Sequence, residues 1–491
     1  MHKRYTALQM QYFNKLSNGA VPATEGAYED NLKKSATMGY NVDPSTGLTV
    51  ESGAGAASAL RIENLDARLT TLSYGTDEFV LWRKLTRIQA RGLVEQYDVL
   101  NSRGRFGHSQ AVAEPDISAP VDPHLQRRIV NMKFFSDTNN ATIASLINRN
   151  IEDVRQLWTD NAIERLVAGI EWQIFYGDST LTSVGSFDKN SEGQGVEFDG
   201  LTRLIPDKNV LDARNKPLDG SMLNQASTII RKAYGRASDV FMPVGAKATF
   251  IQSLPVTQLA LMNNSAGATN TVGLNPQGFQ SANGVLALNG SATMEIKNIL
   301  NDDELGALGQ AMTPVVTAEV TKNDANSQFS DAEAGQTLNY KVVATADRGD
   351  SFAAPVSAAL DAKTSSVALT IKVPAMGVLQ PDYVSVYREF PSTGDFYLLA
   401  RIGVNQAQSD GSIVFNDEND VIPGTVDVFV GDMSANVIQL YELLPFVELP
   451  LAQVNATYTW TILWYGALAL RAPKRWVRIK NVQYMASESQ Y

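Results

Sequence analysis

Residues 461–484, "TILWYGALALRAPKRWVRIKNVQY", decide between fold classes because an apolar run in them turns basic at once. A membrane anchor, a nucleic-acid-binding tail and a buried strand that ends at a subunit contact would each fit this stretch. The apolar run, residues 457–470, contains threonines and a glycine and is shorter than the roughly 18–20 residues of a membrane-spanning helix. Large apolar residues alternate with threonines, which predicts a half-buried strand that becomes fully buried at Ile462–Tyr465. We favour the strand, ended by Pro473 and followed by a basic half that meets a neighbouring subunit.

The composition is that of an ordinary globular protein. The chain has 491 residues, of which 44% are apolar and 19% are charged. This length favours about two to four domains. The net charge of −11 argues against a protein whose main task is binding nucleic acid through phosphates. The first residues, "MHKRYTALQMQYFNKL", lack the unbroken apolar core of a secretory signal, and we expect no membrane association.

Few residues suit catalysis or metal binding. The chain has no cysteine, which excludes disulfides and thiolate metal sites, and its three histidines are His2, His108 and His124. It contains no G-x-S-x-G, Walker A or G-x-G-x-x-G motif. The acid-rich segments 301–304 and 416–420 lack the spacing of a calcium loop, so turn chemistry is the simpler explanation. The sequence therefore predicts no catalytic residue, no metal site and no cofactor.

The segments along the chain differ in character. Residues 17–60 are rich in Gly, Ala, Ser and Asn, which is typical of an extended arm with little core of its own. Between 85 and 133, two short strand-like limbs flank a Gly/Pro/Asp-rich middle. This pattern predicts a long β-hairpin that needs a partner to stay ordered. Residues 221–264 indicate a small helix–strand–helix element.

Residues 139–177 predict one long amphipathic helix. Apolar residues from Ile143 to Ile174 recur at steps of three, four or eight and form one stripe. Asn139 or Asn140 would cap its start, and Gly177 would end it in the left-handed conformation. With a rise of about 1.5 Å per residue, the helix would exceed roughly 45 Å.

The pattern changes again between 313 and 432. Segments such as "TLNYKVVATADRGDS" and "DYVSVYREF" alternate apolar and polar residues and are bounded by turn residues. Several short strands without a helix predict an antiparallel sandwich. Because the earlier pattern resumes afterwards, we interpret this module as an insertion.

The order of these parts is similar to one family. An arm, a long hairpin, a long helix, a small α/β domain and closing strands resemble the major capsid proteins of tailed double-stranded DNA bacteriophages, which have the Hong Kong 97 (HK97) fold. The stretch "LLPFVELPLAQVNATYTWTILWYGALALRAPKRWVRIKNV" (443–482) looks like the C-terminal signature of the larger capsid proteins of contractile-tailed phages. "FYGDST" (175–180) and "FDGLTRLI" (198–205) look like the same group. The resemblance covers most of the chain outside the insertion.

The resemblance implies an α+β, HK97-like fold and a role for each segment. The implied parts are an N-terminal arm at 1–60, a peripheral domain at 61–214 with an E-loop at 83–133 and a spine helix at 139–177, an axial domain with returning peripheral strands at 215–312 and 433–485, and an inserted immunoglobulin- or fibronectin-like decoration domain at 313–432.

Basic residues on the hairpin and after the closing strand are the candidates for contacts between subunits. They are Arg83, Arg87, Arg91, Arg103, Arg105, Arg127, Arg128, Arg471, Lys474, Arg475 and Arg478. They would pair with acids of the next subunit and set the register of assembly. The alternative is a solvated surface, since exposed ion pairs contribute only about 0–1 kcal/mol each. The basic residues at 471–480 could instead touch packaged DNA. No lysine lies between Lys84 and Lys133, so the covalent cross-link of some family members is not expected.

Sequence and resemblance together predict a structural protein and not an enzyme. The chain would be a major capsid protein that self-assembles into hexamers and pentamers of an icosahedral shell enclosing phage double-stranded DNA. It would be made in the host bacterial cytoplasm and reside in the virion. A portal, a scaffold and a maturation protease would act with it during assembly, and packaged DNA would make weak, non-specific contact at most.

Two other functions fit parts of the sequence. One is a phage tail or surface adhesin that uses the inserted sandwich as its binding module. The other is an unrecognised hydrolase that depends on His108 or His124. The triangulation number, the host, trimming of the arm and any ligand of the inserted domain stay open at this point.

Overall fold

The computed structural model describes residues 41–42, 49–50, 78–102, 123–147, 154–181, 197–253, 278–294, 299–302, 305, 313–331, 333–346, 349–374, 381–391, 393–408, 411–453 and 456–484. The chain forms two compact units, Met1–Thr70 and Thr71–Tyr491. In the first unit, β1 (Asn41–Val42) pairs with β2 (Thr49–Val50) in antiparallel fashion. The rest of the expected arm at 1–60 lies outside the described residues. All elements below belong to the second unit.

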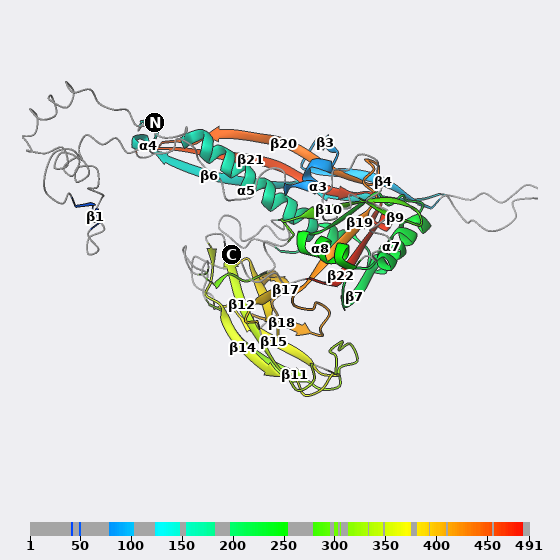
Figure 1. The fold of residues 1–491 in the computed structure, drawn as a ribbon. Helices are drawn as coiled ribbons and strands as arrows, with labels where there is room; N and C mark the ends of the chain where they lie inside the picture. The colour runs from blue at the N-terminus through cyan, green and yellow to red at the C-terminus, as the bar shows by residue number, and fades with distance from the viewer. Residues whose placement is uncertain are drawn as a thin grey trace, which may run out of the picture. The chain divides into compact units, whose positions relative to one another are not determined.

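The closing apolar stretch is an inner strand of a four-stranded sheet. β21 (Thr457–Leu470) pairs with β20 (Ile438–Pro450) on one side and with β6 (Lys133–Thr142) on the other, and β3 (Arg87–Gln89) joins the sheet beyond β20. The three long strands run side by side in Figure 1. Burial along β21 is continuous from Gly466 to Leu470. The strand interpretation is confirmed, but the fully buried part begins a few residues later than the sequence indicated.

Helix α5 (Val154–Tyr176) packs against this sheet and closes the first core. Its Ile170 and Ile174 are fully buried. The ring of Trp464 on β21 meets the ring of Trp82 edge-on, with centroids 5.5 Å apart. Trp82 belongs to the short helix α3 (Val80–Lys84), which precedes β3. Burying each such side chain contributes about 1.5–3 kcal/mol, so this core fixes the sheet, the helix and the root of the hairpin together.

The long helix is shorter than the sequence predicted because its expected first residues are strand residues. β6 continues to Thr142 and pairs Asn139 and Asn140 with β21, so neither asparagine caps a helix. The short helix α4 (Ile143–Ile147) follows, and α5 has 23 residues, about 34 Å at the usual rise. Gly177 does follow α5, but without a left-handed φ. A Cβ at Gly177 would lie 2.3 Å from the Phe198 carbonyl oxygen, so close approach of backbone requires this glycine.

A second, six-stranded sheet has the order β7-β22-β19-β8-β10-β9. Its strands are β7 (Val210–Lys216), β22 (Trp476–Gln483), β19 (Thr425–Gly431), β8 (Asp239–Pro243), β10 (Gly284–Ser291) and β9 (Gly278–Ser281). Helices α7 (Gly220–Lys232) and α8 (Val244–Ser253) contribute Ile230 and Phe250 to its core. The helix–strand–helix order expected at 221–264 corresponds to α7, β8 and α8.

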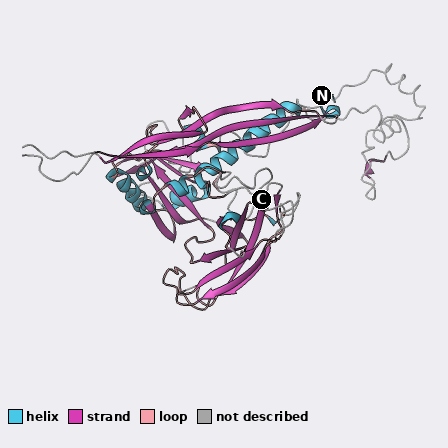
Figure 2. Cartoon of the chain, turned by 180° about the vertical axis from the view of Figure 1, so that it is seen from behind, coloured by secondary structure: helices cyan, strands magenta, loops and turns pink. Residues whose placement is uncertain are grey.

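Between β10 and β19 in the chain, the strands from β11 to β18 form an all-β module with a core of its own. One sheet has the order β11-β15-β18, and the other has the order β13-β12-β16-β17 with β14 also paired to β12. The strands are β11 (Val315–Thr321), β12 (Thr337–Ala346), β13 (Gly349–Asp350), β14 (Ala354–Ala359), β15 (Ser366–Lys372), β16 (Tyr383–Glu389), β17 (Phe396–Gly403) and β18 (Ser412–Asp417). Residues of both sheets share one hydrophobic cluster, and Figure 2 draws the module almost wholly as strands. β19, inside the expected insertion at 313–432, instead belongs to the six-stranded sheet.

The hairpin is a two-stranded sheet between β3 and β6. β4 (Val94–Ser102) pairs with β5 (His124–Asn131), with a bulge between Leu100 and Ser102. Residues 103–122, where the sequence predicts the tip of the hairpin, lie outside the described residues.

Candidate functional sites

The two faces of the β4–β5 hairpin have different surroundings. Opposite residues of an antiparallel pair share a face. On the inner face Tyr97 is opposite Arg128, and the Tyr97 hydroxyl donates to the carbonyl oxygen of Leu470 at 3.3 Å. Burial is the main cause that raises the pKa of Tyr97 above its usual range. The inner face therefore fixes the hairpin to the end of β21.

The outer face of the hairpin is apolar and exposed. Leu125 and Ile129 are 63% and 61% exposed, and Leu100 lies opposite Leu125. Between these side chains, Arg127 Nε donates to Asp98 Oδ1 at 2.9 Å, and this hydrogen bond lowers the pKa of Asp98. A two-stranded ribbon with one wet apolar face is marginal by itself, so this face suits contact with another protein surface.

The arginines at the root of the hairpin do not form one cluster. Arg83 lies in the last turn of α3 and is exposed. The Arg87 guanidinium lies 4.4 Å from the centroid of the Trp82 ring, which is a cation–π geometry. Arg91 is exposed, and its backbone N–H donates to Glu95. Arg103 and Arg105 lie outside the described residues.

The basic segment after β21 is largely paired within the chain. Arg471 donates to the Tyr441 hydroxyl at 2.7 Å, Arg475 lies 3.7 Å from Asp432, and Arg478 binds Asp427 at 2.8 Å. In 471–480 only Lys474 has an exposed side chain. Sequence reasoning missed the two ion pairs because Asp427 and Asp432 lie about fifty residues earlier in the chain, on or beside β19. The sequence predicted that this basic half meets a neighbouring subunit, but the side chain of Arg478 is only 18% exposed and pairs with Asp427 of the same chain.

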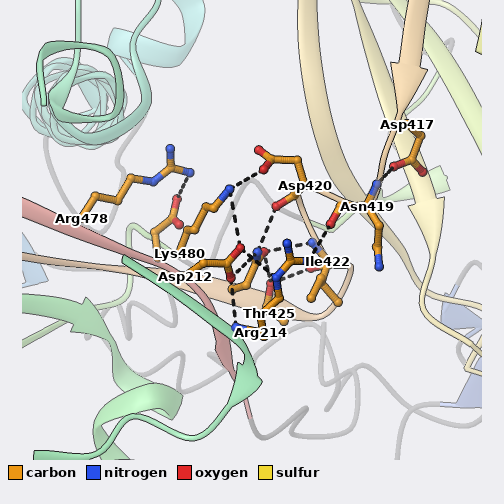
Figure 3. A network of polar contacts seen from close by, with 11 residues as sticks. Asp212, Arg214, Asp417, Asn419, Asp420, Ile422, Thr425, Arg478 and Lys480 are labelled. Atoms are coloured by element: carbon orange, nitrogen blue, oxygen red, sulfur yellow. Dashed lines mark hydrogen bonds and ion pairs between the residues drawn. The ribbon is translucent and has the colours of Figure 1, made fainter. Parts of the chain in front are cut away.

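A polar junction ties the exit of the all-β module to the six-stranded sheet (Figure 3). Asn481, in the left-handed conformation with φ of 56°, donates to Asp212 Oδ1 and to the Asp420 carbonyl oxygen, both at 2.9 Å. Its own Oδ1 accepts from the Ile422 N–H at 3.0 Å. Lys480 binds the Asp420 carboxylate. One buried side chain thus joins β7, β22 and the segment that leads into β19.

A buried ion pair lies inside the module just before this junction. Arg388 on β16 and Asp417 on β18 have side chains only 2% and 4% exposed, and they form an ion pair. The Tyr340 hydroxyl donates to the same carboxylate at 2.8 Å, and Arg388 Nη2 donates to Asn419 Oδ1 at 2.6 Å. Burial and the neighbouring Asp417 raise the pKa of Tyr340. The acid-rich segment 416–420 therefore contributes Asp417 and Asn419 to this buried network.

The module also contacts the end of α5. Arg401 on β17 donates from Nη2 to the Tyr176 carbonyl oxygen at 2.9 Å, and its guanidinium lies 4.5 Å from the Trp172 ring centroid. Asn405 donates to the Thr180 carbonyl oxygen at 3.2 Å. A cation at the C-terminal end of a helix complements the helix dipole.

Glu171 is a fully buried carboxylate on α5. Its oxygens lie 3.4 Å from the backbone N–H donors of Leu81 and Trp82 and from the Ser291 hydroxyl. Burial raises its pKa from an ordinary 4.5 to about 7, and these hydrogen bonds oppose the shift. The carboxylate connects α5 with α3 at the root of the hairpin.

The described part of the chain shows no arrangement for metal binding. Within it, no cluster of three or more His, Cys, Asp or Glu side chains could hold a metal ion. No helix among the described residues is both long and apolar enough to cross a membrane. His124 is exposed at the start of β5, and His108 lies outside the described ranges.

Comparison with known proteins identifies relatives across almost the whole chain. No family model matches. The major capsid protein of Staphylococcus phage K is 41% identical over 462 residues, which cover 94% of this chain and 96% of that protein. The putative major capsid protein of Enterococcus phage phiEF24C is 40% identical over 460 residues, again 94% of this chain and 96% of that protein. None of these relatives supports an adhesin.

Solved structures with a related arrangement are more distant in sequence. The holo-SrpI encapsulin complex from Synechococcus elongatus has 9% identity and a TM-score of 0.44, with 89% of this chain and 99% of that chain covered. The capsid of Myoviridae phage XM1 has 9% identity and a TM-score of 0.41, with 88% and 100% covered.

Proposed function

This chain belongs to the family of phage major capsid proteins, and on that basis we propose that its copies assemble as hexamers and pentamers of an icosahedral shell around phage double-stranded DNA. The observation that carries the proposal is a sequence relationship that spans nearly the whole chain. The exposed apolar outer face of the β4–β5 hairpin supports it, because such a surface is stabilised by burial against another subunit.

The proposed fold is HK97-like, with each segment in the role that the family implies. Residues 1–60 would be the N-terminal arm, 83–133 the E-loop, and the spine helix would be α5. The axial domain would comprise 215–312 together with β19 and β22, and β20 and β21 would be the returning peripheral strands. Because β19 pairs with β8 and β22, we place the end of the inserted module near Asp417 and no longer at 432.

The inserted module is proposed to be an immunoglobulin- or fibronectin-like decoration domain. Two antiparallel sheets with a common core support this assignment. The module would lie on the outer face of the shell, and no ligand is assigned to it.

The hairpin arginines are proposed to contact the next subunit. Arg83, Arg91 and Arg127 have exposed side chains that can reach an acid of a neighbour. In the basic segment after β21, Lys474 is also proposed to contact the next subunit. Arg471, Arg475 and Arg478 are instead assigned to contacts inside the chain. Exposed pairs add little affinity each, so their contribution would be to orientation and register.

Assembly is proposed to take place in the host cytoplasm with a portal, a scaffold and a maturation protease, and the product would be the virion shell. Contact with packaged DNA would be weak and non-specific, because the chain is acidic overall and the basic segment after β21 is already paired. We assign no enzymatic activity to the chain.

Electron microscopy of the purified chain tests the proposal. We would image it alone and after co-expression with the neighbouring phage genes. Shells, tubes, or rings of five and six subunits are expected in at least one preparation. A dispersed monomer in both preparations would reject the proposed function.

A further inference from the structure

A cavity of about 280 Å³ lies at the root of the hairpin, under its inner face. Its walls come from β4, β5, the start of β6, the segment after α5 and the end of β21. Side chains of Arg128, Lys133, Tyr97 and Asp199 are among those that line it. Ile129 and Asn131 also line the cavity and are exposed, which places an opening beside the hairpin.

The charges around this cavity favour an anion. Arg128 and Lys133 bring two positive charges, and Asp199 brings one negative charge. The Asp199 carboxylate already accepts from the Ser179 N–H at 3.1 Å and lies 3.6 Å from Arg203 Nε. Part of its charge is therefore compensated by these two donors.

Lys133 is an unusual residue for the wall of a cavity. The residue is 9% exposed and stands at the first position of β6, where it is paired with Gly466 of β21. Burial is the main cause that lowers the pKa of its ammonium group, and the negative charge of Asp199 opposes this shift. An additional anion in the cavity would stabilise the buried ammonium group.

We propose that this cavity, the root pocket, binds a side-chain carboxylate from a second copy of this chain, with Lys133 and Arg128 as the binding residues. The inference rests on the proposed function and adds a specific site to it. A second copy is the occupant because Ile129 belongs to the exposed apolar outer face and also lines the pocket, so a subunit that covers that face would lie beside the pocket. The chain also has 52 acidic and 41 basic residues, so a second copy contains many carboxylates that could bind in the pocket.

A zero-length cross-link tests the occupant directly. Subunits labelled with ¹⁵N and unlabelled subunits are assembled together and treated with a carbodiimide. The reagent activates a carboxylate, the neutral amine of Lys133 attacks the acyl carbon, and an amide forms while the carbodiimide leaves as the urea with the oxygen of the carboxylate. Mass spectrometry should find Lys133 joined to Asp or Glu in peptides that combine the two isotopes. Links only within one chain, to Asp199 or to an acid of 182–196, would overturn the proposal.

Matched substitutions test whether the pocket matters for assembly. Lys133→Met should lower the assembled fraction at least tenfold at the concentration where half of the wild type assembles, and Arg128→Gln should act in the same direction. Lys133→Arg, which keeps the positive charge, should assemble to nearly the same fraction as the wild type. Lys247→Met removes a half-buried lysine on α8 that does not line the root pocket, and it should change the assembled fraction less than twofold. Equal assembly of Lys133→Met and wild type would overturn the proposal while leaving the proposed function intact.

Two further measurements distinguish a loss of folding, and binding of a free anion, from binding of a second copy. Thermal unfolding of unassembled Lys133→Met and Lys247→Met shows whether either variant has lost its fold, in which case the cross-link decides the question. Inorganic phosphate is then added to unassembled wild type. Stabilisation that depends on Lys133, in the absence of cross-links between chains, would assign the pocket to a free oxyanion and overturn the proposal. If the wild type never assembles, the proposed function and this inference both fail.

Discussion

Arg401 of the all-β module binds both carboxylate oxygens of Glu197, at 2.8 Å from Nη1 and 2.9 Å from Nη2. The two side chains are only 11% and 12% exposed. A two-pronged ion pair between a strand of the module and the segment that follows α5 is specific in geometry as well as favourable in charge. This ion pair thus attaches the module to the segment that follows α5, in addition to the two points where the chain enters and leaves the module.

Replacing Glu197 by Gln should destabilise the protein strongly. The substitution leaves the Arg401 guanidinium buried without its carboxylate, and loss of one partner of a buried pair costs about 3 kcal/mol or more. Urea unfolding followed by tryptophan fluorescence measures the change, since Trp172 lies beside Arg401.

Two controls accompany this prediction. Arg203→Gln breaks an ion pair with Asp178 in which the arginine is 45% exposed, and it should cost less than about 1 kcal/mol. The double substitution Arg401→Met with Glu197→Leu should be less damaging than the sum of the two single changes. Strict additivity would contradict a direct interaction.

Asp417→Asn should destabilise the all-β module selectively. Arg388, which is 2% exposed, would lose its counter-charge, at a cost of about 3 kcal/mol. Tyr340→Phe removes only the hydroxyl that donates to Asp417 and should cost about 1 kcal/mol. Hydrogen exchange should show faster opening in β12, β16 and β18 of the Asp417→Asn variant, with unchanged protection in β8 and β22. An equal loss of protection in both regions would mean that the ion pair supports the whole unit.

Glu171→Gln should remove a pH dependence of stability. The folded chain raises the pKa of Glu171 from 4.5 to about 7, so it binds the proton more tightly than the unfolded chain does. This contribution to stability is fully present below about pH 4.5 and is lost as the pH rises through 7, by about 3 kcal/mol at most. Unfolding free energies of wild type and variant at pH 5 and pH 8 measure it. The wild type should lose more stability than the variant between these values; parallel losses would contradict the shift.

Two glycines on and after α5 should respond in opposite ways to alanine. At Gly177 a Cβ would meet backbone oxygens at 2.3 and 2.6 Å, so Gly177→Ala should destabilise the chain by a few kcal/mol. At Gly169, inside the helix, a Cβ would meet nothing within 4 Å. Gly169→Ala should therefore stabilise the chain by about 0.5–1 kcal/mol, through higher helix propensity. Thermal unfolding of both variants checks the signs, and a stabilising Gly177→Ala would refute the close approach.

The elements that sequence could predict are those with strong local signals. The alternation of Trp460 and Ile462 with threonines has the period of a strand, and β21 is one. The apolar stripe of α5 also has a regular period, that of a helix, and it predicted the helix. The start of the helix could not be predicted in the same way, because residues 139–142 have few apolar neighbours in sequence. Their pairing with β21, more than 300 residues later in the chain, decides their structure. Tertiary context of this kind overrides local propensity.

The candidate sites show the same division. Arg127 and Arg128 were predicted together as contact residues, yet adjacent residues of a strand point to opposite faces. One is on the outer face with Asp98, and the other is on the inner face with Tyr97. The partners of Arg478 and Lys480 could not be predicted, because Asp427 and Asp420 come from other strands and loops. Glu171 gave no sequence signal, since one acid in an amphipathic helix is normally at the surface.

The central place of β21 has a consequence for synthesis on the ribosome. β6 is complete at Thr142, but the strand that pairs with it begins only at Thr457. At roughly 5–20 residues per second, the ribosome needs about 15–60 s to make the intervening chain. During that time the edge of β6 is exposed, and α5 has no sheet to pack against. The nascent chain therefore cannot complete its main core, or offer a finished surface to another copy, until translation has passed Leu470.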